Sequence, residues 1–215
     1  MKSTKFWVLF SLFILPLVFY IFLSKGIYRY ANLPILTNEV MNVSAIDETE
    51  KASFNNNINV VCFLGNDIKT AKGSIFNLNE IIYKRYYQKP FFKVIAIIPK
   101  ESEEAYKSVI NELSAYTDTS KWNFVYTNSQ NIELIFDSFK TPFKLNDNFY
   151  SENAFIIDKK LRLRGRKDDE DSANGKLYGY NMKSVAVLKN KMRDDIDIIY
   201  YQLKKSAEKE ARRNQ

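Results

Sequence analysis

The 215-residue sequence predicts an α/β domain, built on a mixed sheet flanked by helices and preceded by one N-terminal transmembrane helix. Three observations support this prediction. Short apolar runs rich in β-branched residues alternate with stretches whose apolar residues recur at helical spacing, a pattern typical of parallel strands joined by helices. Two further short runs are separated by a tight turn, which indicates an antiparallel hairpin. An uncharged apolar stretch near the N-terminus is long enough to span a membrane.

The apolar stretch runs from residue 6 to residue 23 without a charge. A spanning helix needs about 20 mainly apolar residues, so we expect a membrane anchor over residues 6–25, after a short tail of residues 1–5. A cleaved signal peptide is the alternative. Its apolar region is usually only about 7–15 residues long, and the nearest small-residue cleavage site here contains Lys25. We therefore favour an uncleaved anchor.

Turn-forming residues divide the rest of the chain. Residues 26–57 are expected to be a linker that ends in three consecutive asparagines. The folded domain is expected over residues 58–205, followed by a charged tail of residues 206–215.

Three strand–helix units open the domain. Each predicted strand is a short apolar run, and each predicted helix carries apolar residues three or four positions apart. Gly65 follows the first strand, Pro90 follows the first helix and Pro99 ends the second strand. The predicted strands are 58–64, 92–98 and 122–126, and the predicted helices are 70–87, 102–116 and 129–139.

The C-terminal part of the domain is predicted to change direction. Residues 154–157 and 161–165 are short apolar runs around Lys159-Lys160, which predicts a hairpin. A charged loop over residues 168–175 and a closing helix from residue 184 to about residue 212 follow. Parallel strands joined by helices and completed by a hairpin form a thioredoxin-like arrangement.

Composition excludes several kinds of chemistry. The chain contains one Cys and no His, so it has no His-dependent catalytic triad, no Cys/His zinc site, no C-x-x-C motif and no internal disulfide. Cys62 lies inside the first predicted strand, where a thiol is expected to be buried and inert. A redox role for Cys62 requires an exposed thiolate and is the alternative.

Several stretches resemble the Sco/SenC family, membrane-anchored thioredoxin-fold proteins that handle copper for cytochrome oxidase assembly. Residues 94–101 (VIAIIPKE) resemble the family strand that ends in a Pro and an acidic residue, and residues 122–124 (WNF) match its Trp-x-Phe strand. Residues 151–158 (SENAFIID) resemble its strand ending in Leu-Ile-Asp, and residues 159–165 (KKLRLRG) resemble the turn and Arg-Gly strand that follow.

The resemblance also shows what this chain lacks. Sco proteins bind copper through a Cys-x-x-x-Cys loop after the first strand and a His before the Leu-Ile-Asp strand. The matching positions hold Asp67, Ala71 and Tyr150. Cu(I) prefers thiolate or thioether ligands, so we expect no copper or other cofactor, no metal site and no catalytic residue at these positions.

The resemblance therefore implies a non-catalytic accessory, scaffold or assembly protein of a respiratory or other envelope complex. We expect a single-pass protein of the cytoplasmic (inner) membrane, with its C-terminal domain on the periplasmic side. Two alternatives stay open: a thiol-redox enzyme of the thioredoxin or peroxiredoxin type that uses Cys62, and a structural membrane subunit. The net charge of +7 would suit nucleic acid or anionic lipid, and the predicted anchor favours the membrane, so no nucleic-acid partner is expected.

Basic side chains alternate along the second strand of the predicted hairpin. On an edge strand such charges discourage aggregation. The functional alternative is a surface that binds an acidic partner or anionic lipid headgroups. The residues of this predicted surface are Lys159, Lys160, Arg162, Arg164 and Arg166.

Acidic residues 168–171 are followed by Gly175, which faintly resembles a calcium loop. The glycine comes one position too late and the closing Glu is absent, so we interpret the segment as a solvated loop.

Overall fold

The computed structural model describes the chain except for residues 1, 27–31, 50, 173 and 214–215. For residues 2–5, 22–26 and 209–211 it describes the backbone alone. The chain divides into two units. Residues 33–196 form the larger one, and residues 1–32 and 197–215 belong to the other, so we treat each by itself.

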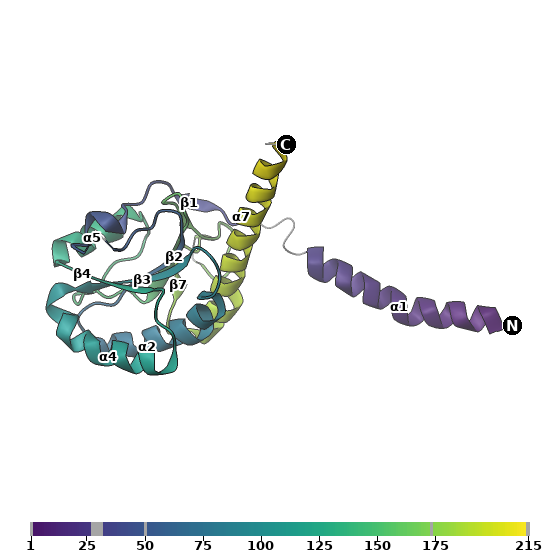
Figure 1. Cartoon of the computed structure of the whole chain (residues 1–215), viewed down its shortest axis with the longest axis horizontal. Helices are drawn as coiled ribbons and strands as arrows, with labels where there is room; N and C mark the ends of the chain where they lie inside the picture. The colour runs from purple at the N-terminus through teal and green to yellow at the C-terminus, as the bar shows by residue number, and fades with distance from the viewer. Residues whose placement is uncertain (1, 27–31, 50, 173, 214–215) are drawn as a thin grey trace. The chain divides into compact units, whose positions relative to one another are not determined.

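In the described part of the chain, seven strands form one mixed sheet (Figure 1). The strand order is β1-β6-β5-β2-β3-β4, with β7 paired to β5. β2, β3 and β4 are parallel, whereas β5 runs antiparallel to β2 and β6 antiparallel to β5. The predicted parallel strands and hairpin are therefore confirmed, and β1 and β7 were not predicted. The strands are β1 (Ile35–Thr37), β2 (Ile58–Phe63), β3 (Phe92–Pro99), β4 (Trp122–Thr127), β5 (Asn153–Ile157), β6 (Leu163–Arg164) and β7 (Tyr180–Asn181).

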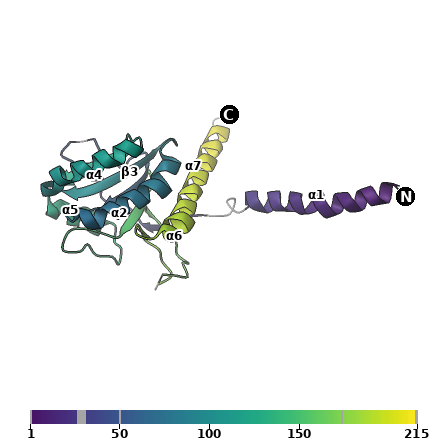
Figure 2. The same ribbon diagram turned by 90° about the horizontal axis from the view of Figure 1, so that it is seen from below.

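Helices cover both faces of the sheet (Figures 1 and 2). α2 (Ile68–Leu78) continues through a π-helical turn, η2 (Asn79–Tyr83), into α3 (Lys84–Tyr86), so the first predicted helix is confirmed. α4 (Glu103–Tyr116) shares its face with α2, while α5 (Ser129–Ser138) lies on the opposite face. The helices join successive parallel strands, as the sequence predicted.

Aromatic rings fill the core on the α5 face. The Phe63 ring lies edge-to-face against Phe136, Phe139 and Phe155, with centroid distances of 5.0, 5.7 and 6.2 Å. These rings contact one another because β2 and β5 are neighbours in the sheet and α5 packs over them. Edge-to-face contacts of this kind stabilise a core beyond the area that they bury.

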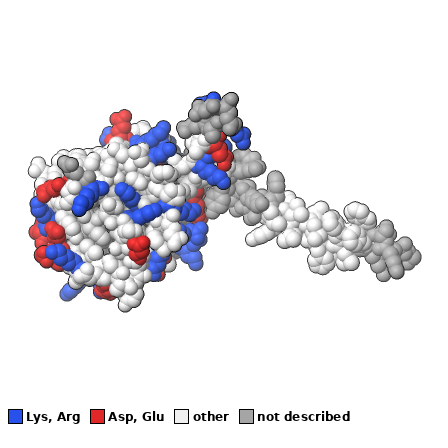
Figure 3. All heavy atoms as spheres, in the orientation of Figure 1, with Lys and Arg blue, Asp and Glu red and all other residues white. Residues whose placement is uncertain are grey.

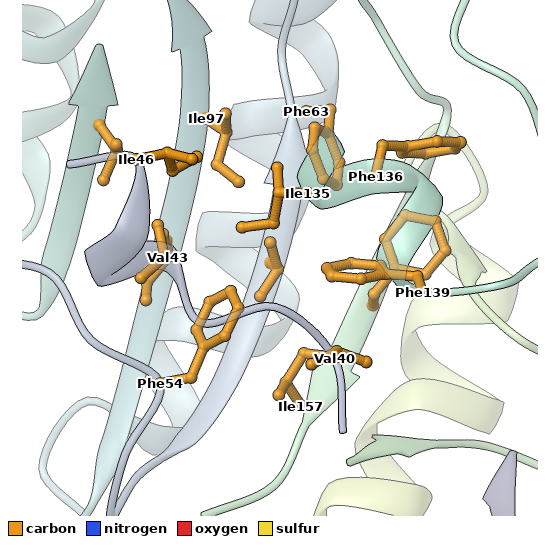
Figure 4. Close-up of a cluster of buried hydrophobic side chains, with 14 of the residues drawn as sticks. Val40, Val43, Ile46, Phe54, Phe63, Ile97, Ile135, Phe136, Phe139 and Ile157 are labelled. Carbon is orange, nitrogen blue, oxygen red and sulfur yellow. The ribbon is translucent and has the colours of Figure 1, made fainter. Parts of the chain in front are cut away.

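The segment predicted as the later part of a linker folds into this core. Val40, Val43, Ile46 and Phe54 are at most 3% exposed and pack with α5 and the sheet (Figure 4). For residues 33–57 the linker prediction is therefore wrong. No periodic signal marks this segment, because its apolar residues follow neither the helical nor the strand period.

The chain closes with helical segments. Within the larger unit these are α6 (Val185–Val187), a π-helical turn η4 (Leu188–Met192) and the start of α7 (Arg193–Arg213). At the other end, α1 (Lys2–Gly26) covers the predicted anchor. Within the residues that the structure describes, no helix has both the length and the hydropathy needed to cross a membrane.

Candidate functional site

The three positions that correspond to the family's copper ligands lie around the end of β2. Leu64 follows β2 and forms an isolated antiparallel bridge with Tyr150. Gly65 comes next, with φ +63°, and a Cβ at this residue would lie 2.2 Å from the Asn148 carbonyl oxygen. Only glycine fits this close approach, which holds the start of α2 against the segment before β5.

Asp67 is a helix cap. Its carboxylate accepts hydrogen bonds from the Thr70 hydroxyl (2.7 Å) and from the Lys69 N–H (3.1 Å), at the start of α2. The bond from Thr70, helped by the backbone, lowers the pKa of Asp67. The side chain therefore stabilises the helix end, which is a common role for Asp at this position.

Ala71 and Tyr150 fill the space beside it. Ala71 is fully buried, and Ser74, one turn further along α2, has its hydroxyl oxygen 2.7 Å from that of Tyr150. Burial raises the pKa of Tyr150, against the smaller opposing effects of Ser74 and Lys183. On the other side, the Tyr106 hydroxyl donates to the carbonyl oxygens of residues 64 and 65. No sequence signal points to Ser74 or Tyr106, because they lie in different elements and match no motif.

A polar cavity of about 360 Å³ opens beside Tyr150. The Lys183 ammonium lies 5.5 Å from the centre of the Tyr150 ring and 2.5 Å from the Glu152 carboxylate. Hydroxyl, amide and ammonium groups dominate the lining, which is Thr70, Phe143, Lys144, Asn146, Tyr150, Ser151, Glu152, Asn153 and Lys183.

This donor set does not fit copper. Cu(I) requires soft sulfur ligands or imidazole, and none of the residues around the cavity carries either. Over the described residues, no group of three or more His, Cys, Asp or Glu side chains could hold a metal ion.

Cys62 does not reach this cavity. It is fully buried in β2, with its sulfur 3.8 Å from the Ile95 carbonyl oxygen. Burial raises the pKa of the thiol, so the reactive thiolate is disfavoured. The predicted burial of Cys62 is confirmed.

Three of the five residues of the predicted basic surface form ion pairs within the domain. β6 is an inner strand between β1 and β5, not an edge. Arg164 is 6% exposed, and its guanidinium lies 2.9 Å from the Asp158 carboxylate, which Arg162 also contacts at 2.6 Å. The Arg164 side chain also donates to the Leu33 carbonyl oxygen. The prediction of an accessible surface is therefore wrong for Arg164.

Arg166 has a similar structural role. Its guanidinium pairs with Asp195 at 2.9 Å, and the Tyr180 hydroxyl donates to the same carboxylate at 2.7 Å. Of the five basic residues, Lys159 and Lys160 alone are exposed. They sit in the hairpin turn, two neighbouring charges rather than a stripe.

The acidic loop is anchored rather than freely solvated. Asp169 is 5% exposed, and the Lys191 ammonium lies 2.7 Å from the carboxylates of both Asp169 and Asp171. The interpretation as a solvated loop is thus wrong for Asp169, since a lysine 22 positions away neutralises it.

Comparisons with known proteins bear on the fold. No protein-family model matches the sequence, and no curated protein matches it significantly. Among solved structures, BsSco, described as a member of the Sco family of cytochrome c oxidase assembly proteins, aligns with a TM-score of 0.54 and 14% identity. The alignment covers 78% of this chain and 98% of BsSco.

A SCO1/SenC family lipoprotein from Bacillus anthracis aligns with a TM-score of 0.52 and 13% identity, over 76% of this chain and 95% of that protein. Likeness at this level of identity concerns the fold. The chain has a thioredoxin-like fold of the Sco/SenC type.

Proposed function

We propose that this chain is a membrane-anchored protein of the Sco type that has lost the copper and redox site. It would act as a non-catalytic accessory, scaffold or assembly protein of a membrane complex, of which a respiratory complex is one candidate. One observation carries the proposal: at the ligand positions, Asp67 caps α2, Ala71 is buried and Tyr150 is hydrogen-bonded to Ser74. None of these groups supplies the thiolates that the relatives' chemistry needs.

The proposed anchor is α1. Its large apolar side chains between residues 6 and 21 are 39–70% exposed, and residues 6–21 include no Lys, Arg, Asp or Glu, so this stretch is white in Figure 3. Exposed apolar surface of this extent favours lipid contact. We place the protein in the cytoplasmic (inner) membrane with the domain outside the cytoplasm. A C-terminal fusion reporter that works only in the cytoplasm should be inactive, and an active one would contradict this placement.

The first test is copper binding, which the proposal predicts to be absent. The full chain in detergent, titrated with Cu(I) against a coloured competing chelator, should take up no stoichiometric copper. A Cys62→Ser variant is the matched control, because it removes the sole thiol. Tight uptake of one Cu(I) per chain that persists in this control would mean that other residues form a copper site, and the proposal would fail.

The thiol-redox alternative requires a thiol at Cys62 that is exposed in the native protein, whereas the proposed function does not. Because the thiol is buried, a maleimide reagent should leave it unlabelled in the native protein and label it fully after unfolding. A Gln130→Cys variant provides the control, since residue 130 lies on the surface of α5 and its thiol should react in the native state. Rapid native labelling of Cys62 in the unmodified chain would favour the enzyme.

A further inference from the structure

β4 is an outermost strand of the sheet, at the end opposite β1 (Figure 1). It pairs with β3 along all six of its residues, and no described strand pairs with its other side. Exposed strand edges present unpaired backbone groups that invite pairing with another chain. The outermost strands at the two ends of the sheet differ in the length of open backbone edge that they present. β1 is three residues long and its register is interrupted, whereas β4 is regular.

The hydrogen bonds of β4 identify which of its backbone N–H and C=O groups lie on the open edge. The Lys121 carbonyl accepts a hydrogen bond from the Val94 N–H on β3. Successive residues of a strand direct their backbone N–H and C=O groups to opposite sides, so those of Trp122, Phe124 and Tyr126 point away from β3, toward the open edge. The Trp122 N–H is already used by the Thr119 carbonyl. Among the described residues, none bonds to the remaining outward groups. These are the carbonyl of Trp122 and both the N–H and the carbonyl of Phe124 and Tyr126.

The strand lacks the residue types that usually protect an edge. Residues 122–127 (WNFVYT) include no charge, proline or glycine, and the two-residue period of a strand places Trp122, Phe124 and Tyr126 on one face. The rings of Trp122 and Phe124 stack with an interplanar angle of 6° and a centroid distance of 5.5 Å. The edge therefore combines free backbone groups with a row of aromatic side chains.

We propose that β4 pairs with β4 of a second copy of this chain, antiparallel and centred on Phe124. In this register the free groups match one another. Each Phe124 N–H donates to the Phe124 carbonyl of the other copy, and each Tyr126 N–H donates to the Trp122 carbonyl of the other copy. All four free N–H groups of the two edges find an acceptor, and a continuous sheet forms across a two-fold axis.

The side chains also suit a second copy. Phe124 lies opposite its own counterpart, and Trp122 lies opposite Tyr126 of the other copy, so aromatic pairs form across the new ladder. Lys121 lies opposite Thr127, so the register sets no like charges against each other. Exposed apolar side chains lie on the helices before and after β4: Tyr116 on α4 is 72% exposed and Leu134 on α5 is 52% exposed.

A cysteine scan tests the register in the full chain in detergent. Paired residues at the centre of the ladder have Cα atoms about 5.5 Å apart, within disulfide range. Phe124→Cys should therefore form a covalent dimer under mild oxidation at least about tenfold faster than Asn123→Cys, whose counterparts lie diagonally beyond disulfide range. The unmodified chain, with Cys62 buried, should not crosslink. Equal crosslinking of the two variants would overturn the proposed pairing.

A charge variant tests the dimer itself. Phe124→Lys sets two ammonium groups opposite each other across the axis, while a lysine on an open edge is tolerated in a monomer. Sedimentation equilibrium in density-matched detergent should show a dimer for the unmodified chain and an association constant about tenfold or more lower for Phe124→Lys. Gln130→Lys, which adds the same charge to the surface of α5, should not weaken the dimer. A monomeric unmodified chain, or an unchanged dimer in Phe124→Lys, would overturn the proposal, and circular dichroism confirms that each variant folds.

Discussion

Replacing Gly65 with alanine is expected to lower the free energy of unfolding by about 3–5 kcal/mol. Two effects add. Gly65 has φ +63°, a backbone conformation that strains any residue with a Cβ. The new Cβ would also lie 2.2 Å from the Asn148 carbonyl oxygen and 2.9 Å from the Tyr150 Cβ. Both neighbours belong to the segment before β5, so relief requires this segment to move away from the end of β2.

Gly73→Ala is the matched control. Gly73 lies in α2, and a Cβ there meets no atom within 4 Å. Alanine should stabilise this helix by about 0.5–1 kcal/mol, because glycine is the poorer helix former. Urea unfolding followed by fluorescence would compare the two variants. Similar stabilities for Gly65→Ala and Gly73→Ala would show that the close approach at residue 65 is unimportant.

Replacing Asp158 with alanine is expected to destabilise the fold by about 3–5 kcal/mol, because a buried guanidinium is left without its carboxylate. Asp158 is 3% exposed and Arg164 is 6% exposed. The carboxylate also accepts from Arg162 and from the Lys160 N–H, so several bonds are lost together. Lys159→Ala, in the exposed hairpin turn, should change stability little in the same urea unfolding measurement.

The pH dependence provides a second test of this pair. Burial alone would raise the pKa of Asp158, but hydrogen bonds from Arg162, the Lys160 N–H and Arg164 outweigh it and hold the pKa below the usual 3.8. The stability contributed by the pair is therefore present above about pH 4 and is lost as the pH falls through the lowered pKa. The difference between the unmodified chain and Asp158→Ala should shrink in acid. A difference that stays constant down to about pH 2 would contradict this ion pair.

The sequence predicts the three parallel strands and the helices between them well, and it predicts β1, β7 and residues 33–57 poorly. β2, β3 and β4 are uninterrupted apolar runs between turn residues, and the helices between them keep a helical period, so local signals suffice. β1 and β7 have three and two residues and carry no such signal. Residues 33–57 carry no signal for a different reason. They reach the core as an irregular segment, which contacts α5 but has no helical or strand period.

The candidate site shows the same division. The absence of Cys and His at the family's ligand positions can be seen in the sequence. What replaces them cannot, because the partner of Tyr150 is Ser74, 76 positions away. The roles of Arg164 and Arg166 cannot be seen in the sequence either, because part of what they bind lies far away in the chain. Their alternation resembles a charged edge, yet Arg166 finds its carboxylate 29 positions further on, at Asp195.

The early segment that completes the core has a consequence for the time course of synthesis. Leu33 accepts a hydrogen bond from Arg164, 131 positions later in the chain. At a ribosomal rate of about 5–20 residues per second, the early segment waits roughly 7–26 s for that partner. Until the end of this interval the core around Val40, Val43 and Phe54 is incomplete, because Phe155, Ile157 and Leu163 are synthesised last. An incomplete core leaves apolar surface open to aggregation and proteolysis, and a chaperone that holds this segment would be of use during those seconds.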